Sequence, residues 1–143
     1  MENTPNAVAA PFIVWKDDFT VGSKMLDGEH QRIIALINQL YDAIQSHHPE
    51  KVIGAVLDGL LDYTRTHFSD EEAMMTEAVY PDIEAHRGLH RQMVQHTTHL
   101  VGQHRLKHGD ISSDVLSFLK RWWVGHICRE DRAYRAFVSK LGR

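Results

Sequence analysis

The sequence predicts an all-α protein that folds as an up-down-up-down antiparallel four-helix bundle. Apolar residues recur at spacings of three and four over four segments, which is the period of an amphipathic helix. Short turn sequences separate the segments, and short connections make neighbouring helices antiparallel. No stretch of the chain shows a competing strand pattern. We therefore expect one bundle preceded by an irregular N-terminal arm.

The arm is predicted to comprise residues 1–22 and the bundle residues 23–143. The first helix is expected from Asp27 to about His47, because isoleucine and leucine side chains keep to one face over this stretch. Pro49 then suits the first turn of a second helix, since the N–H that proline lacks has no partner there.

The remaining helices are delimited by prolines and capping residues. Pro81 is expected to stop the second helix, because proline cannot continue one. Asp82 is the expected N-cap of a third helix, which runs from Ile83 to about His108. The sequence Ser-Ser-Asp at residues 112–114 is expected to cap a fourth helix that continues to the C-terminus.

Composition restricts the function classes. The 143 residues include 16 basic and 19 acidic ones, for a formal net charge of −3, so no broad positive surface is available to hold nucleic acid. No run of about 18 apolar residues occurs, which argues against stable membrane insertion. Glu2 and Pro11 are atypical of a signal peptide, and Cys128 is the only cysteine. We expect a cytoplasmic monomer.

Histidine is the abnormal component, at 11 of 143 residues. His86 and His90 are four apart, the spacing with which two imidazoles on one helix face share a metal. His67 and Glu71 share the inward face of the second helix in the same way. An acid and an imidazole on an apolar face are expensive to bury unless they coordinate something.

Two further helices complete the pattern. His30 lies near the start of the first helix, and His126 in the fourth is followed by Glu130 and Asp131. A single inward histidine is usually a hydrogen-bonded core residue, but five of them with acids would leave many unpaired polar atoms in an ordinary core. The sequence therefore predicts a metal site. The remaining histidines are expected at the surface: His47, His48, His96, His99, His104 and His108.

Four segments carry these residues: DGEH (27–30), HFSDEE (67–72), HRGLH (86–90) and HICRED (126–131). In this order on four helices they resemble the hemerythrin family, and most closely its bacterial single-domain members, the bacteriohemerythrins. The resemblance runs from about Trp15 to Tyr134. It implies a cofactor of two iron ions joined by an oxo or hydroxo bridge. The implied ligands are His86, His90 and His126 on one iron, His30 and His67 on the other, and Glu71 and Asp131 bridging both.

The implied ligand set also indicates a function. Two irons that each accept about six ligands have one position left over on the iron with only His30 and His67. By the resemblance, dioxygen binds there reversibly and rests as a hydroperoxide. Five neutral histidines and few carboxylates should disfavour more oxidised states, unlike the Glu-x-x-His sites of di-iron oxygenases.

Helix geometry conflicts with one implied ligand. A residue four after His126 shares its face, whereas a residue five after is turned about 140° away, so spacing alone favours Glu130 over Asp131. Asp131 reaches the site only if the helix is locally widened, as in a π-bulge. We therefore predict a π-bulge between His126 and Asp131.

Apolar side chains near the ligands are candidates for the lining of the oxygen pocket. Trp122 and Trp123 lie one turn before His126, at a position where the family often has Trp followed by Leu. Trp123 would either narrow the space beside the open iron position or merely pack between helices. The candidate lining residues are Ile33, Ile34, Phe68, Trp122 and Trp123.

The sequence thus predicts an oxygen carrier, store or scavenger rather than an enzyme, with dioxygen as ligand and an oxygen-consuming enzyme as recipient. Two alternatives stay open. One is a di-iron enzyme that reduces peroxide or nitric oxide. The other is a bundle that buffers iron or zinc without oxygen chemistry.

Overall fold

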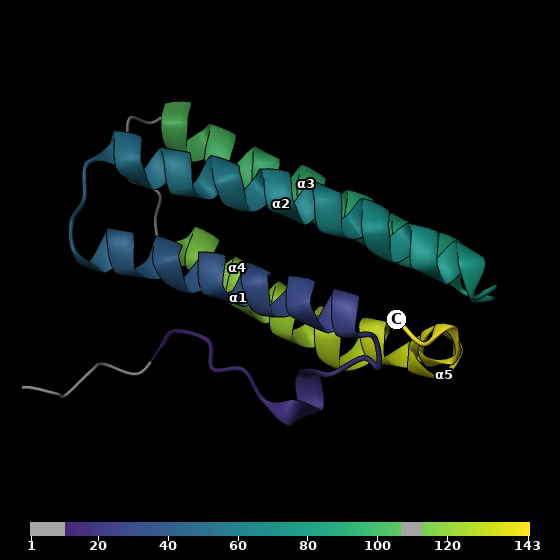
Figure 1. Cartoon of the computed structure of the whole chain (residues 1–143). Coiled ribbons are helices and arrows are strands. Elements are labelled where there is room, and N and C mark those ends of the chain that lie inside the picture. Colours follow the sequence, from purple (N-terminus) through teal and green to yellow (C-terminus); the bar gives the residue numbers. More distant parts are fainter. Residues whose placement is uncertain (1–10, 107–112) are drawn as a thin grey trace, which may run out of the picture.

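The computed structural model describes residues 11–106 and 113–143, and its described residues contain helices but no strand. The predicted helical bundle is confirmed. Four long helices reverse direction at each connection, with α2 beside α3 and α1 beside α4 (Figure 1). Their bounds are α1 (Lys24–Gln45), α2 (Glu50–Glu77), α3 (Ile83–Leu106) and α4 (Ser113–His126).

The start of α1 lies three residues before the predicted one. Ser23 caps it, because the Ser23 hydroxyl accepts a hydrogen bond from the backbone N–H of Leu26 at 3.2 Å. Apolar spacing alone misses this turn, since Lys24 and Met25 lie outside the inward stripe.

Non-glycine residues in the left-handed region end α1 and α2. His47 has φ 54° and Val79 has φ 56°. After Val79, the N–H of Tyr80 bonds the carbonyl of Met75 at 3.0 Å, which is the bond pattern of a Schellman cap. This cap ends α2 at Glu77, four residues before the proline that was expected to stop it.

The prediction of one continuous fourth helix to the C-terminus is wrong. After His126 the helix widens into a π-helix, Ile127–Asp131, and a turn at Tyr134 precedes the short α5 (Arg135–Val138). Figure 1 shows α5 turned across the end of the bundle. Val138 is fully buried there with Met74, so burial of this end of the core overrides the continuous helical period.

Residues 11–22 lie along the bundle with a single 3₁₀ turn, Asp17–Phe19. The side chain of Asn38 on α1 holds them by two hydrogen bonds to the backbone of Ile13, at 2.8 and 2.9 Å. The Phe12 ring stacks on Tyr41 at 4.6 Å between centroids. The segment is irregular in backbone, but Ile13, Phe19 and Val21 are buried against the bundle.

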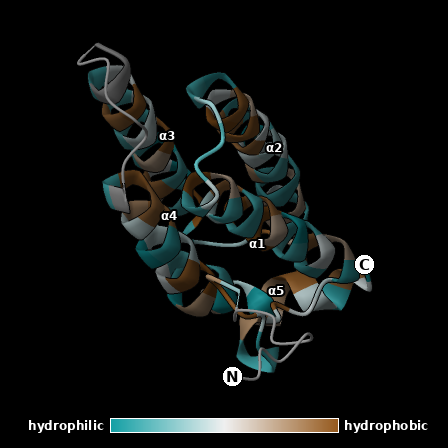
Figure 2. Cartoon of the chain, turned by 90° about the vertical axis from the view of Figure 1, so that its left-hand side faces the viewer, coloured by the Kyte–Doolittle hydropathy of each residue, from teal (hydrophilic) through white to brown (hydrophobic). Residues whose placement is uncertain are grey.

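Apolar residues recur along every long helix (Figure 2) and form two separate hydrophobic clusters. On α1, Leu26 belongs to the cluster near α5 and Ile33 to the larger cluster, and His30 lies between them. On α2, Phe68 and Met74 flank Glu71 in the same way. A buried polar layer therefore separates the two apolar clusters.

Within residues 11–106 and 113–143 we find no helix with the length and apolarity needed to cross a membrane.

Candidate metal centre

The seven predicted ligands come together in one buried cluster at the polar layer. Each of the four long helix segments contributes to it, and no member exposes more than 3% of its surface. The members are His30 from α1, His67 and Glu71 from α2, His86 and His90 from α3, His126 from α4 and Asp131 from the π-helix.

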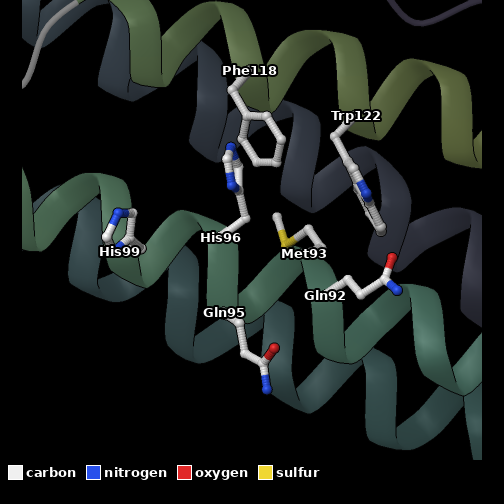
Figure 3. A pocket seen from close by; sticks show the side chains of 7 residues that line it. All are labelled: Gln92, Met93, Gln95, His96, His99, Phe118 and Trp122. Carbon is white, nitrogen blue, oxygen red and sulfur yellow. The ribbon is translucent and has the colours of Figure 1, made fainter.

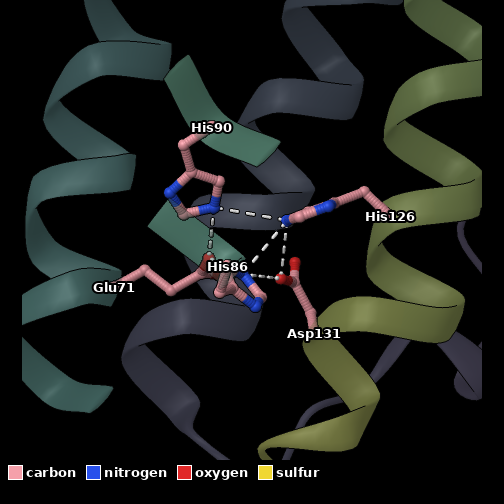
Figure 4. A group of neighbouring side chains, drawn as sticks. All are labelled: Glu71, His86, His90, His126 and Asp131. Carbon is pink, nitrogen blue, oxygen red and sulfur yellow. Dashed lines mark hydrogen bonds and ion pairs between the residues drawn. The ribbon is translucent and has the colours of Figure 1, made fainter. Parts of the chain in front are cut away.

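Three histidines and two carboxylates form the larger group (Figure 4). Nε2 of His126 lies 3.1 Å from Nε2 of His86 and 3.2 Å from Nε2 of His90. Oε1 of Glu71 lies 3.0 Å from the Nε2 atoms of His86 and His90. Oδ1 of Asp131 lies 2.9 Å from His86 and 3.0 Å from His126.

Two histidines and the same two carboxylates form the smaller group. Nε2 of His30 lies 3.0 Å from Oδ2 of Asp131 and 3.3 Å from Oε2 of Glu71. Nε2 of His67 lies 3.2 Å from Oε2 of Glu71. The smaller group thus offers four donor atoms where the larger offers five.

The carboxylates link the two groups because each divides its oxygens between them. Glu71 directs Oε1 to the larger group and Oε2 to the smaller, and Asp131 does the same with Oδ1 and Oδ2. This is the arrangement of bridging carboxylates between two ions.

The donor set fits two metal ions. Nε2 of His126 lies within 3.2 Å of the Nε2 atoms of both His86 and His90, and one imidazole nitrogen cannot act as donor and acceptor at once. Four further atoms lack a well-aligned hydrogen bond: Nε2 of His30, Nε2 of His67 and both oxygens of Asp131. The larger group offers five donor atoms, one more than a tetrahedral zinc site takes, which favours an ion of higher coordination number.

The π-helix that was predicted between His126 and Asp131 is confirmed at Ile127–Asp131. Its extra residue per turn brings Asp131 onto the face of His126, where Asp131 is fully buried. Glu130, which straight-helix spacing favours, lies 3.8 Å from the guanidinium of Arg129 and outside both groups.

Two acids that the sequence analysis did not single out form hydrogen bonds with the Nδ1 atoms of two candidate ligands. Glu29 accepts at 2.6 Å from Nδ1 of His67, and Glu72 accepts at 2.8 Å from Nδ1 of His90. An acceptor on Nδ1 orients the ring and leaves Nε2 free for a metal. The only sequence signal was adjacency, since each acid directly follows or precedes a candidate ligand.

Tyr134 is a further neighbour that sequence reasoning missed. Its fully buried hydroxyl donates to Oε2 of Glu71 at 2.9 Å. Burial and the nearby carboxylates of Glu71 and Asp131 raise the pKa of Tyr134 well above its ordinary value, so the phenol stays a donor.

In the metal-free protein, contacts between histidines and carboxylates shift the pKa values of both. Burial alone lowers the pKa of His30, but its contacts with Asp131 and Glu71 outweigh this and raise the pKa to about 10. The same balance raises the pKa of His86 to about 9. For Glu71, burial opposes ionisation, yet the surrounding histidines hold its pKa well below its ordinary value. The carboxylates thus stay ionised and available to cations.

All five predicted lining residues belong to the larger hydrophobic cluster or pack against it. Ile33, Ile34, Phe68 and Trp123 are buried in the larger hydrophobic cluster, and Trp122 is half-buried at its edge. Phe68 stacks on His90 with centroids 3.7 Å apart, which places it against a candidate ligand.

Trp122 also stacks on His126, at 4.2 Å between centroids. Trp122 also lines a surface groove of about 540 Å³ between α3 and α4 (Figure 3). His96 and His99 line the same groove, and both are exposed, as expected; His96 packs on the Phe118 ring.

His47 and His48 are exposed, as predicted. The side chains of His104 and His108 lie outside the described part of the chain. Cys128 is half-buried and belongs to neither ligand group.

A family model described as the hemerythrin HHE cation binding domain matches residues 21–138. The chain is a member of the hemerythrin family. Among its relatives is a bacteriohemerythrin of Stenotrophomonas maltophilia, 37% identical over 138 residues, which cover 92% of this chain and 87% of the relative. A bacteriohemerythrin of Pseudomonas aeruginosa is 33% identical over 125 residues, covering 85% of this chain and 78% of the relative.

Solved hemerythrin structures share the fold. A crystal structure of wild-type hemerythrin superposes with a TM-score of 0.82 at 28% identity, covering 90% of this chain and 98% of the other. A leucine-to-tyrosine variant of hemerythrin gives 0.83 at 27% identity, covering 91% and 99%. The structural and sequence relationships therefore agree over nearly the whole bundle.

Proposed function

We propose that this hemerythrin-family chain binds dioxygen reversibly at a non-haem di-iron centre. The observation that carries the proposal is the unequal donor set: two carboxylates join a five-donor group to a four-donor group in one buried layer. When bound, the iron pair supplies the two electrons that dioxygen accepts and returns. We assign the ligands as the resemblance implied, with Glu71 and Asp131 as bridges.

The chain's own residues favour binding at the smaller group. His30 and His67 supply two imidazoles there against three at the larger group, so an ion held by them has more room for an outside ligand. Ile33, Phe68 and Trp123 lie in the apolar cluster beside it and exclude water.

The donor set also favours a carrier over an oxidase. Five imidazoles and two shared carboxylates leave the centre more cationic than a carboxylate-rich one, which opposes further oxidation. We therefore propose that the chain stores or delivers oxygen rather than catalysing a reaction, and that an oxygen-consuming enzyme receives it. We further propose a cytoplasmic location, since Cys128 cannot form a disulfide within the chain and a lone thiol suits a reducing compartment, and we propose that the chain acts as a monomer.

The test combines metal content with an optical spectrum of the full chain. We expect about two irons per chain, in line with two donor groups, and a colourless ferrous form that gains a visible charge-transfer band with oxygen and loses it on purging. Immediate oxidation to a stable yellow form without an adduct contradicts reversible binding. Steady consumption of peroxide or nitric oxide with an electron donor would then support the enzyme alternative.

Zinc retention distinguishes the remaining alternative. The five donor atoms of the larger group exceed the four of a tetrahedral zinc site, so we expect iron to be retained in preference to zinc. A chain that keeps zinc in the presence of ferrous iron and shows no coloured adduct would indicate a metal-buffering role instead.

A further inference from the structure

Trp122 and Trp123 are adjacent in sequence but pack against different ligand groups. Trp122 stacks on His126 of the larger group. The centroid of the Trp123 ring lies 5.9 Å from that of His67 and 6.5 Å from that of His30, the two histidines of the smaller group. Trp123 is fully buried and is among the largest buried side chains of the protein.

The indole nitrogen of Trp123 has no hydrogen-bond partner among the described residues, although it is buried. An indole N–H can only donate, and leaving a buried donor unpaired costs about 1–3 kcal/mol. A phenylalanine would fill similar space without that cost. A buried tryptophan is normally placed where its N–H can reach an acceptor.

The rings that pack on Trp123 supply no such acceptor. Phe68 stacks on it at 5.5 Å and has no polar atom. Nδ1 of His67 is hydrogen-bonded to Glu29, and its Nε2 lies 3.2 Å from Oε2 of Glu71. Nδ1 of His30 is unpartnered too, but it carries the proton when Nε2 binds a metal and is then a second donor.

No described residue therefore accepts from the indole N–H, and the rings of both histidines of the smaller group lie against the Trp123 ring. We infer that the indole N–H of Trp123 donates a hydrogen bond to an anionic ligand bound beside His30 and His67, and so selects for ligands that carry negative charge. The inference rests on the proposed function, because it takes the smaller group to hold a metal with an open position. It makes Trp123 a specificity-determining residue of the pocket and not only a filler.

The test uses azide, a small anion that accepts hydrogen bonds, and the iron-loaded full chain oxidised to the diferric state. Trp123→Phe keeps an aromatic ring but removes the N–H. We expect it to weaken azide binding at least tenfold in an absorbance titration, because hydrogen bonds to charged groups are the strong ones. If Trp123 only filled space, the smaller ring would bind azide as tightly as the unsubstituted chain or more tightly, which would overturn the inference.

Thr64→Val is the matched control. The Thr64 hydroxyl is also buried and unpartnered, and it lies one turn before His67 on α2. We expect this variant to bind azide within twofold of the unsubstituted chain. An equal loss in both variants would mean that general polarity of the layer, and not the Trp123 donor, sets the affinity.

A second readout needs no variant. The infrared azide stretch of the unsubstituted chain should shift between H₂O and D₂O, because the donated proton exchanges, and Trp123→Phe should abolish the shift. No isotope shift in the unsubstituted chain overturns the inference even if the variant fails to fold. Failure of the unsubstituted chain to bind two irons overturns the proposed function and this inference with it, whereas normal iron content with an unchanged Trp123→Phe affinity overturns the inference alone.

Discussion

Replacing Tyr134 with phenylalanine removes one hydrogen bond and almost no volume from the end of the bundle. The lost bond runs from a fully buried hydroxyl to Oε2 of Glu71 at 2.9 Å. A hydrogen bond to a charged group contributes about 1.5–3 kcal/mol. We expect the lower part of that range, about 1.5–2 kcal/mol, because Oε2 keeps its contacts with His30 and His67 at 3.3 and 3.2 Å.

For a chain of 143 residues the unfolding entropy is about 0.3 kcal/mol/K near 60 °C. The expected loss therefore lowers the Tm of the metal-free protein by about 5–7 °C. Urea unfolding at pH 7, followed by circular dichroism, measures the free energy directly. Metal-free samples are required, because bound ions would add their own binding free energy to stability.

Tyr80→Phe is the matched control. Tyr80 is buried in the same hydrophobic cluster and touches the Tyr134 ring edge-on at 6.3 Å, but no described residue hydrogen-bonds its hydroxyl. We expect its Tm to stay within about 2 °C of the unsubstituted chain. An equal fall for both variants, or a fall below about 2 °C for Tyr134→Phe, would refute the reasoning that the bond to Glu71 carries the effect.

Three further predictions concern the cluster. Asp131→Asn should reduce iron content well below two per chain by elemental analysis, whereas Glu130→Gln should leave it unchanged; the reverse result would contradict the role of the π-helix. In the metal-free protein the pKa of His30 is raised to about 10 and that of His86 to about 9, so their stabilisation is complete below pH 6.5 and is lost as pH rises through 9 to 10. The free energy of unfolding should fall over this window, and a flat profile would count against the buried ion pairs. Glu29→Gln weakens the hydrogen-bond acceptor that lies 2.6 Å from Nδ1 of His67 and should lower the metal affinity about 10–100-fold in a chelator competition. The control is Asp62→Asn, which changes an exposed acid and should leave the affinity unchanged.

The ligand set shows which features of the site can be predicted from local sequence. His86 and His90 share a face because four residues span about one helical turn. In the structure their Nε2 atoms lie 3.1 and 3.2 Å from Nε2 of His126. The π-helix could also be inferred, but only because the family resemblance implies Asp131 as a ligand, and a ligand five residues after His126 is incompatible with a regular helix. Spacing alone predicts the pair His86 and His90, whereas it favours Glu130 over Asp131.

Contacts between helices could not be predicted from the spacing of residues along one helix. Glu29 lies beside His30 in sequence but bonds His67, 38 residues away. The turn at Tyr134 was missed because the apolar period continues through Phe137 and Val138. That period satisfies a straight helix and one that turns across the bundle end equally well, and burial in the cluster that contains Leu26, Met74 and Tyr80 decides between them.

By itself, therefore, the sequence determined the four long helices through their short-range spacing, and the resemblance of its motifs to a known family indicated the residues able to ligate metal. The tertiary structure decided how Glu71 and Asp131 divide their oxygens between two groups, which acids hold the imidazoles, and that Trp123 packs on His30 and His67 while Trp122 packs on His126. Those features depend on the relative rotation and depth of helices, which a one-residue or one-turn shift would change without altering any apolar pattern.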